Sequence, residues 1–250
     1  MLCTIDTTKR IIDWLTAYSE SSGLNTFVVG VSGGVDSALT STLCAETNIR
    51  TIVVSMPIHQ NQHQLSRARK HIEWLKSKYK NVISVEKDLT PVFESFRSTL
   101  QDITSDLALA NSRSRLRMTT LYQIAQVNTG LVVGTGNKVE DFGVGFFTKY
   151  GDGGVDISPI ADLMKSEVVT MAASLGILDD LVYATPTDGL WDNDRTDEEQ
   201  LGVSYCDLEW AMQYNGGDEL STEQKEILDV YYKLHQTNKH KLLPIPVCKF

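Results

Sequence analysis

TFVVGVSGGVDSALTSTLCAE, residues 26–46, combines three signals that together predict a parallel α/β fold. A β-branched run at Phe27–Val31 leads directly into SGGVDS, and an alanine-rich helical pattern over Val35–Thr47 follows. A strand, a tight glycine turn and a helix in this order are typical of a backbone cradle for phosphate. The lysine of the GxxxxGK[ST] loop is missing, so the stretch does not predict the γ-phosphoryl chemistry of that loop.

Further strand candidates repeat the pattern along the chain. Short β-branched runs occur at Thr51–Met56, Val82–Val85 and Leu131–Gly134, and none alternates regularly with polar residues, as expected for strands buried on both faces. Helical patterns are found at 8–21, Gln62–Tyr79, Asn111–Asn128 and Lys165–Leu175. This alternation predicts a doubly wound, mainly parallel sheet with helices on both faces.

Composition narrows the class of protein. The 250 residues are 42% hydrophobic and 22% charged, which is ordinary for a globular protein, and we expect one domain over residues 1–250. The net charge of −9 disfavours a nucleic-acid partner but permits a small nucleotide. There is no apolar run long enough for a membrane span and no signal-peptide pattern, so we expect a cytoplasmic protein without a membrane partner. The four cysteines are scattered without a CxxC motif, so we expect them to be reduced thiols: Cys3, Cys44, Cys206 and Cys248.

The SGGVDS loop offers the donors that an anion needs. Its glycines permit positive φ angles and leave backbone N–H groups uncovered, so that these groups can converge on an anion. The helix that follows adds the positive end of its dipole. Ser32 and Ser37 add hydroxyl donors. Asp36 would repel phosphate unless a cation lay between them, so it is the natural Mg²⁺ ligand. A turn that binds nothing is the alternative; the placement between a buried strand and a helix favours phosphate.

The second half of the chain holds further candidate site residues. In NSRSRLRM (111–118), Arg113, Arg115 and Arg117 alternate and cannot share one helical face, so we expect at least one to point into the site and the others to bind carboxylates or water; a solvated arginine face is the alternative. In the segment 132–168, a strand ends at VVGTG, where ligands bind in doubly wound sheets, and Glu140 follows, able to share a cation with Asp36.

Two resemblances follow from these motifs. SGGVDS resembles the pyrophosphate loop of the N-type ATP pyrophosphatases, which cleave ATP between the α- and β-phosphates. GFFTKYGDGG (145–154), TPTDGLWDNDRTDEEQLGVSY (185–205) and NKHKLLP (238–244) together resemble the ammonia-dependent NAD synthetases, and the similarity runs over essentially the whole chain. The resemblance implies an adenine nucleotide alpha-hydrolase-like fold.

That resemblance also implies a reaction. It is ATP-dependent amidation of deamido-NAD by ammonia, giving NAD, AMP and pyrophosphate through a nicotinyl-adenylate, with Mg²⁺ as cofactor. No glutaminase domain precedes residue 1, so we expect free ammonia as the nitrogen source. The resemblance further implies a homodimer whose deamido-NAD site lies near the interface. The acidic segment 185–200 is either a solvated linker or a mobile lid.

Roles are carried over by position. The metal ligands implied are Asp36 and Glu140, and the catalytic residues are Asp156 and Lys165. The ATP-binding residues implied are Gly30, Val31, Ser32, Gly33, Gly34, Val35, Asp36, Ser37, Thr135, Lys165 and Thr187. The deamido-NAD contacts implied are Arg115, Lys149, Asp156, His240 and Lys241.

Some positions depart from the relatives. The spacing between Glu140 and GFFTK varies by one residue among them, Asp188 stands where alanine is common, and Leu242 stands where a basic residue is usual.

Two other functions are alternatives. Thiolation of tRNA would need a basic surface and a reactive cysteine near the loop, and a nucleotide sensor without turnover would be expected to lack the charged site residues.

Overall fold

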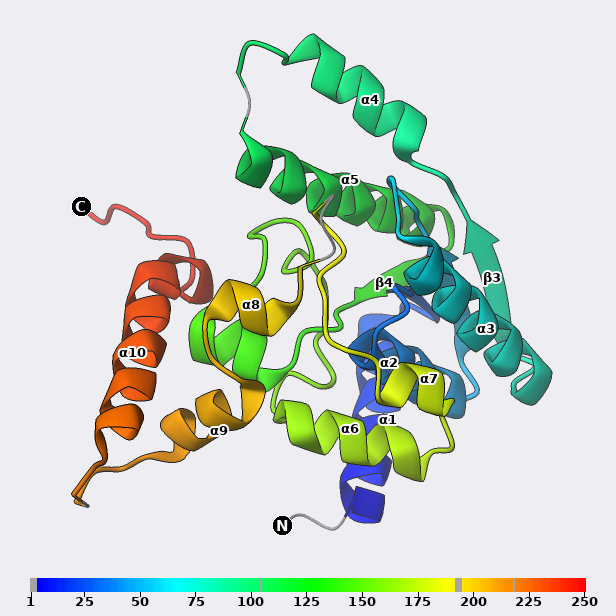
Figure 1. Cartoon of the computed structure of the whole chain (residues 1–250). Coiled ribbons are helices and arrows are strands. Elements are labelled where there is room, and N and C mark those ends of the chain that lie inside the picture. The colour runs from blue at the N-terminus through cyan, green and yellow to red at the C-terminus, as the bar shows by residue number, and fades with distance from the viewer. Residues whose placement is uncertain (1–3, 104, 192–194, 218) are drawn as a thin grey trace.

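The fold is a parallel sheet between two layers of helices. A computed structural model describes residues 4–250 apart from 104, 192–194 and 218. In this part of the chain, four parallel strands form one sheet in the order β3-β2-β1-β4 (Figure 1). They are β1 (Thr26–Gly30), β2 (Arg50–Ser55), β3 (Val82–Glu86) and β4 (Gly130–Val133). The doubly wound parallel sheet predicted from the sequence is confirmed, and each strand lies within one residue of its predicted bounds.

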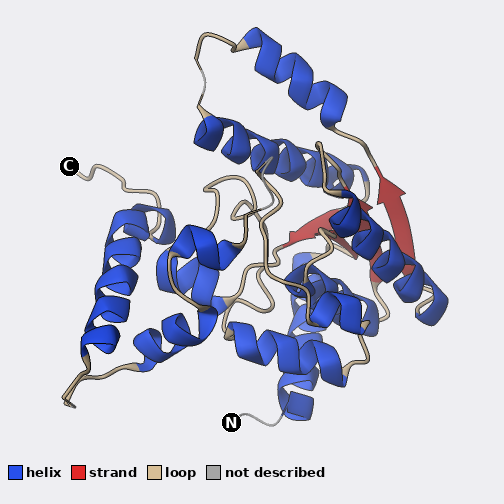
Figure 2. Cartoon of the chain, in the orientation of Figure 1, coloured by secondary structure: helices blue, strands red, loops and turns tan. Residues whose placement is uncertain are grey.

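Helices cover both faces of the sheet (Figure 2). Five helices pack on one face: α1 (Thr4–Ser22), α2 (Val35–Glu46), α3 (Gln62–Lys78), α6 (Lys165–Ser174) and α7 (Asp179–Val182). Two helices cover the other face: α4 (Thr90–Thr99) and α5 (Asp106–Val127). Helix α4 was not predicted, and α5 begins five residues before its predicted start because Ser105 caps it, accepting a hydrogen bond from the Ala108 amide.

The sheet is buried on both sides, which explains the unbroken hydrophobic runs. Phe27 and Val29 belong to the core beneath α1, α2 and α6, whereas Val28 and Val132 belong to the core beneath α4 and α5. All four side chains are fully buried. Successive residues of a strand point to opposite faces, so a strand covered on both faces needs apolar residues at every position.

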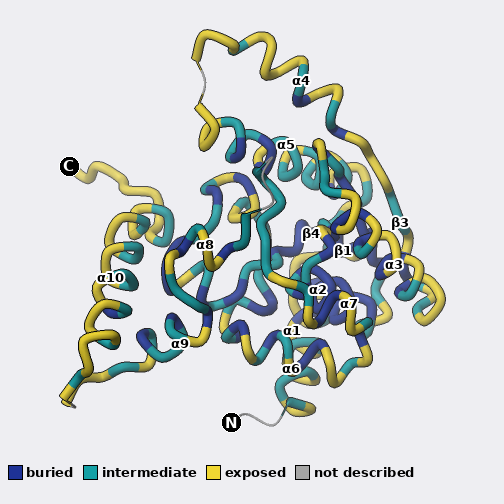
Figure 3. Tube along the Cα trace, viewed as in Figure 1, coloured by how far each residue is buried: buried dark blue, intermediate teal, exposed yellow. Residues whose placement is uncertain are grey.

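The π-helix after β4 and the helices from residue 197 onward form a separate layer. The π-helix η1 (Val139–Val144) and helices α8 (Asp197–Leu201) and α9 (Tyr205–Gln213) share a small core. Helix α10 (Thr222–Leu242) packs across η1 so closely that a Cβ at Gly145 would lie 2.4 Å from the Cβ of Asn238. Figure 3 shows that most of α10 and α4 is exposed or half-buried, in contrast to α2.

Two predictions about the chain as a whole can be compared with the fold. None of the helices in the described residues combines the length and apolar composition that a membrane crossing requires. Cys44, Cys206 and Cys248 are free thiols, and Cys3 lies outside the described residues.

Candidate active site

A pocket opens at the carboxyl ends of the strands. It lies beside β1, which has β2 on one side and β4 on the other, so the strand order reverses at this point. Ligands of doubly wound sheets usually bind at such a point. The residues predicted to bind ATP all line this pocket, apart from Gly33. Glu140 also lines it, and so does the segment after β2, represented by Met56, Gln60 and Gln64.

The glycine loop, residues 30–37, presents unpaired amides to the pocket. Gly33 has φ +92°, and a Cβ there would lie 2.4 Å from the Gln64 carbonyl oxygen, so the position needs glycine. The first hydrogen bond of α2 runs from Ala38 N to Gly34 O, which leaves the amides of residues 35–37 without a helical acceptor. These donors at the positive end of α2 form an anion site.

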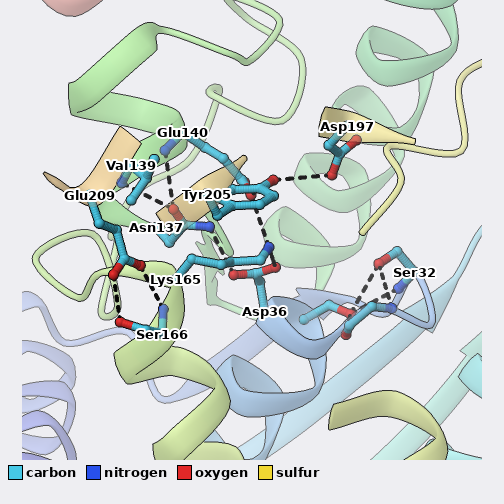
Figure 4. Close-up of polar contacts among 12 residues, drawn as sticks. Ser32, Asp36, Asn137, Val139, Glu140, Lys165, Ser166, Asp197, Tyr205 and Glu209 are labelled. Carbon is cyan, nitrogen blue, oxygen red and sulfur yellow. Dashed lines mark hydrogen bonds and ion pairs between the residues drawn. The ribbon is translucent and has the colours of Figure 1, made fainter. Parts of the chain in front are cut away.

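An ion-paired group of side chains adjoins the loop (Figure 4). Lys165 Nζ lies 2.6 Å from Asp36 Oδ2 and 2.9 Å from Glu140 Oε1. Burial disfavours its charged form, but the two carboxylates outweigh this and raise the pKa of Lys165. Helix α2, η1 and the first residue of α6 therefore bring three predicted site residues into contact.

Two residues that were not predicted hold these carboxylates. The fully buried Asn137 donates to Asp36 Oδ1 at 3.0 Å, and its own Oδ1 accepts the amides of Val139 and Glu140. The Tyr205 hydroxyl donates to Glu140 Oε1 at 2.6 Å, and the Lys165 ammonium lies 4.8 Å from the centre of its ring. We call Asp36, Asn137, Glu140, Lys165 and Tyr205 the cation network.

Two further carboxyl groups lie beside this network. Asp197, 6% exposed, is 3.2 Å from the Tyr205 hydroxyl through Oδ2, and its Oδ1 has no hydrogen-bond partner among the described residues. Burial and the neighbouring Glu140 raise the pKa of Asp197 to about 7. Burial and Glu140 likewise raise the pKa of Asp141, in the pocket wall, to about 8. The pocket is thus rich in carboxyl groups, and two of them hold their protons more tightly than an exposed aspartate does.

The donor set fits Mg²⁺ bound together with a nucleotide. Within the described ranges, no three His, Cys, Asp or Glu side chains are grouped to hold a metal ion by themselves. Asp36 and Glu140 supply two carboxylates that converge on one point. Mg²⁺ is commonly held by one or two carboxylates, with phosphate oxygens and water completing its shell.

Glu140 lies in the π-helix η1, which is capped by Gly145. Gly145 ends it in the left-handed conformation, with φ +64°, and donates its amide to the Glu140 carbonyl five residues back. A π-turn contains one residue more than an α-turn and often lies at a functional site.

Four of the residues predicted to contact deamido-NAD lie together, and we call them the basic cluster: Arg115, Lys149, His240 and Lys241. Lys149 Nζ donates to the His240 carbonyl at 2.9 Å, and the Arg115 guanidinium is 3.4 Å from the Lys149 carbonyl. Lys241 Nζ donates to the carbonyls of Gly145 and Phe147 at 2.8 and 2.9 Å, and burial lowers its pKa. The basic cluster is not part of the pocket lining.

Asp156 lies apart from both groups. Its Oδ2 accepts the Val132 amide at 2.8 Å and its Oδ1 accepts the Tyr122 hydroxyl at 3.0 Å, so the carboxylate is bonded to β4 and α5. It is exposed and does not line the pocket. Its predicted catalytic and substrate-binding roles stay predictions.

The three arginines of 111–118 do point in different directions. Arg117 lines the pocket and donates to the Met56 carbonyl and Gln60 Oε1, and burial lowers its pKa to about 10. Arg113 is buried over the Phe93 ring and donates to the Leu190 carbonyl. The expectation that at least one arginine points into the site is met by Arg117, which had not been selected.

The predicted lid, residues 185–200, borders the pocket where it is described; residues 192–194 lie outside the described residues. The Thr187 hydroxyl donates to the Arg195 carbonyl at 3.1 Å. Gly189 has φ +61° and lies against Gln60 and Gln64. Helix α8 begins at the end of the segment with a capping box of Thr196 and Glu199.

Known proteins match this chain along almost its full length. The family model described as NAD synthase matches residues 7–244. The NH(3)-dependent NAD(+) synthetase of Carboxydothermus hydrogenoformans is 34% identical over 235 residues, covering 94% of this chain and 93% of the relative.

Solved structures also align with the whole chain. The structure of NMN synthetase from Francisella tularensis aligns with a TM-score of 0.90 and 30% identity over 100% of both chains. The NH3-dependent NAD synthetase from Campylobacter jejuni aligns with a TM-score of 0.77 and 24% identity, over 99% of this chain and 100% of the other.

Proposed function

Because this chain belongs to the NAD synthase family, whose members are ligases, we propose that it uses ATP and ammonia to amidate deamido-NAD, giving NAD, AMP and pyrophosphate. The observation that carries this proposal is the pocket itself. There the free amides of the glycine loop and the Asp36–Lys165–Glu140 group border one space at the strand ends. An anion site beside a cation site is what a magnesium nucleotide requires.

In the proposed mechanism, the nicotinate carboxylate attacks the α-phosphorus of ATP. The bond to the bridging oxygen breaks, and pyrophosphate leaves with the electron pair. The amides of residues 35–37 and Lys165 stabilise the charge that grows on the departing phosphates. Asp36 and Glu140 would hold Mg²⁺, which when bound would neutralise part of the phosphate charge.

In the second step, ammonia attacks the carbonyl of the nicotinyl-adenylate, AMP leaves, and one proton is released. Closure of the 185–200 segment over the pocket would protect the adenylate from water. Ammonium must lose a proton before it can attack, so activity is expected to rise with pH above neutral. Asp156 is proposed to contact deamido-NAD or to steer ammonia with the acceptor capacity that its bonds to Val132 and Tyr122 leave.

A second candidate substrate is nicotinate mononucleotide, which would give NMN. It is favoured by the full-length likeness to the Francisella tularensis NMN synthetase. It is also favoured by the basic cluster, in which Lys149 and Lys241 donate to backbone carbonyls of their own chain. Nicotinate mononucleotide has fewer phosphates than deamido-NAD, so it needs fewer lysine side chains of the basic cluster that are free to bind phosphate.

Turnover assays with the two substrates side by side test the proposal. The enzyme is incubated with ATP, Mg²⁺ and ammonium plus either deamido-NAD or nicotinate mononucleotide. The amide product is then measured together with AMP and pyrophosphate. NAD formed in equal amounts with AMP and pyrophosphate supports the main proposal, and a higher kcat/KM with the mononucleotide supports the second. AMP and pyrophosphate without either amide would reject both.

We also propose a cytoplasmic homodimer with the nicotinate-nucleotide site near the subunit interface. Sedimentation equilibrium tests the dimer, since a monomer at micromolar concentration would contradict it. Glutamine is not expected to replace ammonium in the assay.

A further inference from the structure

Lys165 occupies the point between the two proposed metal ligands. One ammonium group lies within 3 Å of an oxygen from Asp36 and of an oxygen from Glu140, as Figure 4 shows. Lys165 is 6% exposed, so water screens these ion pairs only weakly. The Lys165 ammonium therefore already neutralises the two converging carboxylates.

A metal ion cannot simply be added to this arrangement. Mg²⁺ bound to the same two oxygens would lie within a few ångströms of the ammonium and repel it strongly. If the ammonium moved away from Asp36 and Glu140, its buried charge would lose both of its ion-pair partners, which is unfavourable. Free Mg²⁺ should therefore bind this ligand-free site poorly, even though two of its ligands are in place.

ATP would remove both obstacles. Its phosphates, bound at the glycine loop, would bring negative charge into the pocket that Lys165 and Asp36 both line. They would offer Lys165 a new counter-ion and would add the metal ligands that the described part of the protein lacks. The exchange moves the ammonium from carboxylate to phosphate while Mg²⁺ takes its former position.

We propose that Lys165 keeps free Mg²⁺ out of the Asp36–Glu140 pair and passes its ammonium to the phosphates when Mg²⁺ and ATP bind together. The proposal rests on the proposed function for the nucleotide, but not on which nicotinate nucleotide is amidated. It implies strong positive coupling between metal and ATP binding, and this coupling must be reciprocal.

The carboxylates are held independently of Lys165. Asn137 bonds to Asp36, and Tyr205 bonds to Glu140. Replacing Lys165 with an uncharged residue should therefore leave two acidic ligands in place and expose a cation site. The variant Lys165→Met has this property, because methionine is unbranched and of similar length.

The test uses Mn²⁺ as the probe and water-proton relaxation as the readout, which distinguishes protein-bound Mn²⁺ from Mn²⁺ on free nucleotide. Without nucleotide, Lys165→Met is expected to bind Mn²⁺ at least tenfold more tightly than the wild type. The matched control is Lys138→Met, since Lys138 pairs with the exposed Asp162 at 2.8 Å, and it should bind like the wild type.

Adding an ATP analogue with a methylene group between the α- and β-phosphorus should raise the Mn²⁺ affinity of the wild type at least tenfold. The same addition should change the affinity of Lys165→Met far less. Lys165→Arg keeps the positive charge and should retain the nucleotide dependence of the wild type.

Either of two results would overturn the proposal: a wild type that binds Mn²⁺ equally well with and without the analogue, or a folded Lys165→Met that gains no affinity. If Lys165→Met fails to fold, Lys165→Gln, which also removes the charge, replaces it in both measurements. Amidation is assayed separately, so a protein that forms neither NAD nor NMN but shows the coupling would reject only the proposed function.

Discussion

The cation network and the basic cluster hold their charges in different ways. In the network, Lys165 and its two carboxylates neutralise one another in a buried position, and each group is also fixed by a neighbour such as Asn137. In the basic cluster, Arg115 and His240 are exposed, and Lys149 and Lys241 bind carbonyl oxygens instead of carboxylates. Changes in the first should impair chemistry, whereas changes in the second should mainly alter affinity.

The largest effect is expected for Asp36→Asn. The change removes a proposed metal ligand and leaves Lys165 with a single carboxylate, so kcat should fall by about 10²- to 10³-fold. Steady-state kinetics at saturating ATP would measure it, with Asp162→Asn as the control because Asp162 is an exposed carboxylate paired with Lys138. A kcat within tenfold of the wild type would show that the network is not at the reacting centre.

A pair of glycine substitutions tests the loop beside the network. Gly33→Ala and Gly176→Ala both place alanine at positive φ, at a cost of about 1–2 kcal/mol each. Only Gly33 also faces a backbone carbonyl, whereas nothing lies within 4 Å of a Cβ at Gly176. We expect a KM for ATP at least tenfold higher for Gly33→Ala and unchanged for Gly176→Ala; equal values would contradict the anion-site assignment.

The helices beneath the glycine loop should be sensitive to acid. His71 on α3 is fully buried, with Nε2 2.9 Å from Ser41 Oγ on α2, and burial lowers its pKa from 6.5 to about 4. The unfolded chain takes up this proton below about pH 6.5 and the folded one does not, so stability falls as pH falls from about 6.5 to about 4. At pH 5 the loss is about 2 kcal/mol.

Urea unfolding at pH 7.5 and pH 5 would measure this contribution. The comparison variant is His71→Phe, which keeps an aromatic ring beside Trp74 and leaves Ser41 bonded to the Ser37 carbonyl. Its stability should depend less on pH, by about the 2 kcal/mol attributed to His71. An unchanged pH dependence would assign the effect to other groups.

The smallest effect is expected in the basic cluster. Lys241→Ala removes a half-buried ammonium bonded to two carbonyls, so KM for the nicotinate nucleotide should rise severalfold and kcat should change little. The increase should shrink as salt is added, because partly exposed charges are screened. The control is Lys80→Ala, because Lys80 is an exposed lysine in the turn after α3. A fall in kcat like that of Asp36→Asn would place this cluster at the reacting centre.

The two regions also differ in how far the sequence could predict them. The strands and the glycine loop follow from local signals, because hydrophobic runs and SGG turns are contiguous in the chain. Asp36 and Glu140 were proposed from the residues to share a cation, whereas Lys165 was assigned by resemblance, and the structure brings the three together. Asp36 is more than a hundred positions from the other two, and no local pattern shows this contact.

Asn137 and Tyr205 were missed for a related reason. An asparagine after a strand resembles any polar turn, and a tyrosine in a helix resembles a core residue. Their roles depend on which carboxylate lies opposite, and that is set by how η1 and α9 pack. Helix α4 was also missed, since it is only 10 residues long and Phe93 is the one residue that it buries.

The strand order has a consequence for how the protein is made. The central strand β1 pairs with β2, which follows about twenty residues later, but its other edge pairs with β4, which begins at Gly130. Until the ribosome has synthesised that distant partner, an apolar strand of the nascent chain has an open edge, and such edges promote aggregation. We therefore expect slow, late completion of the sheet and a need for chaperones early in synthesis.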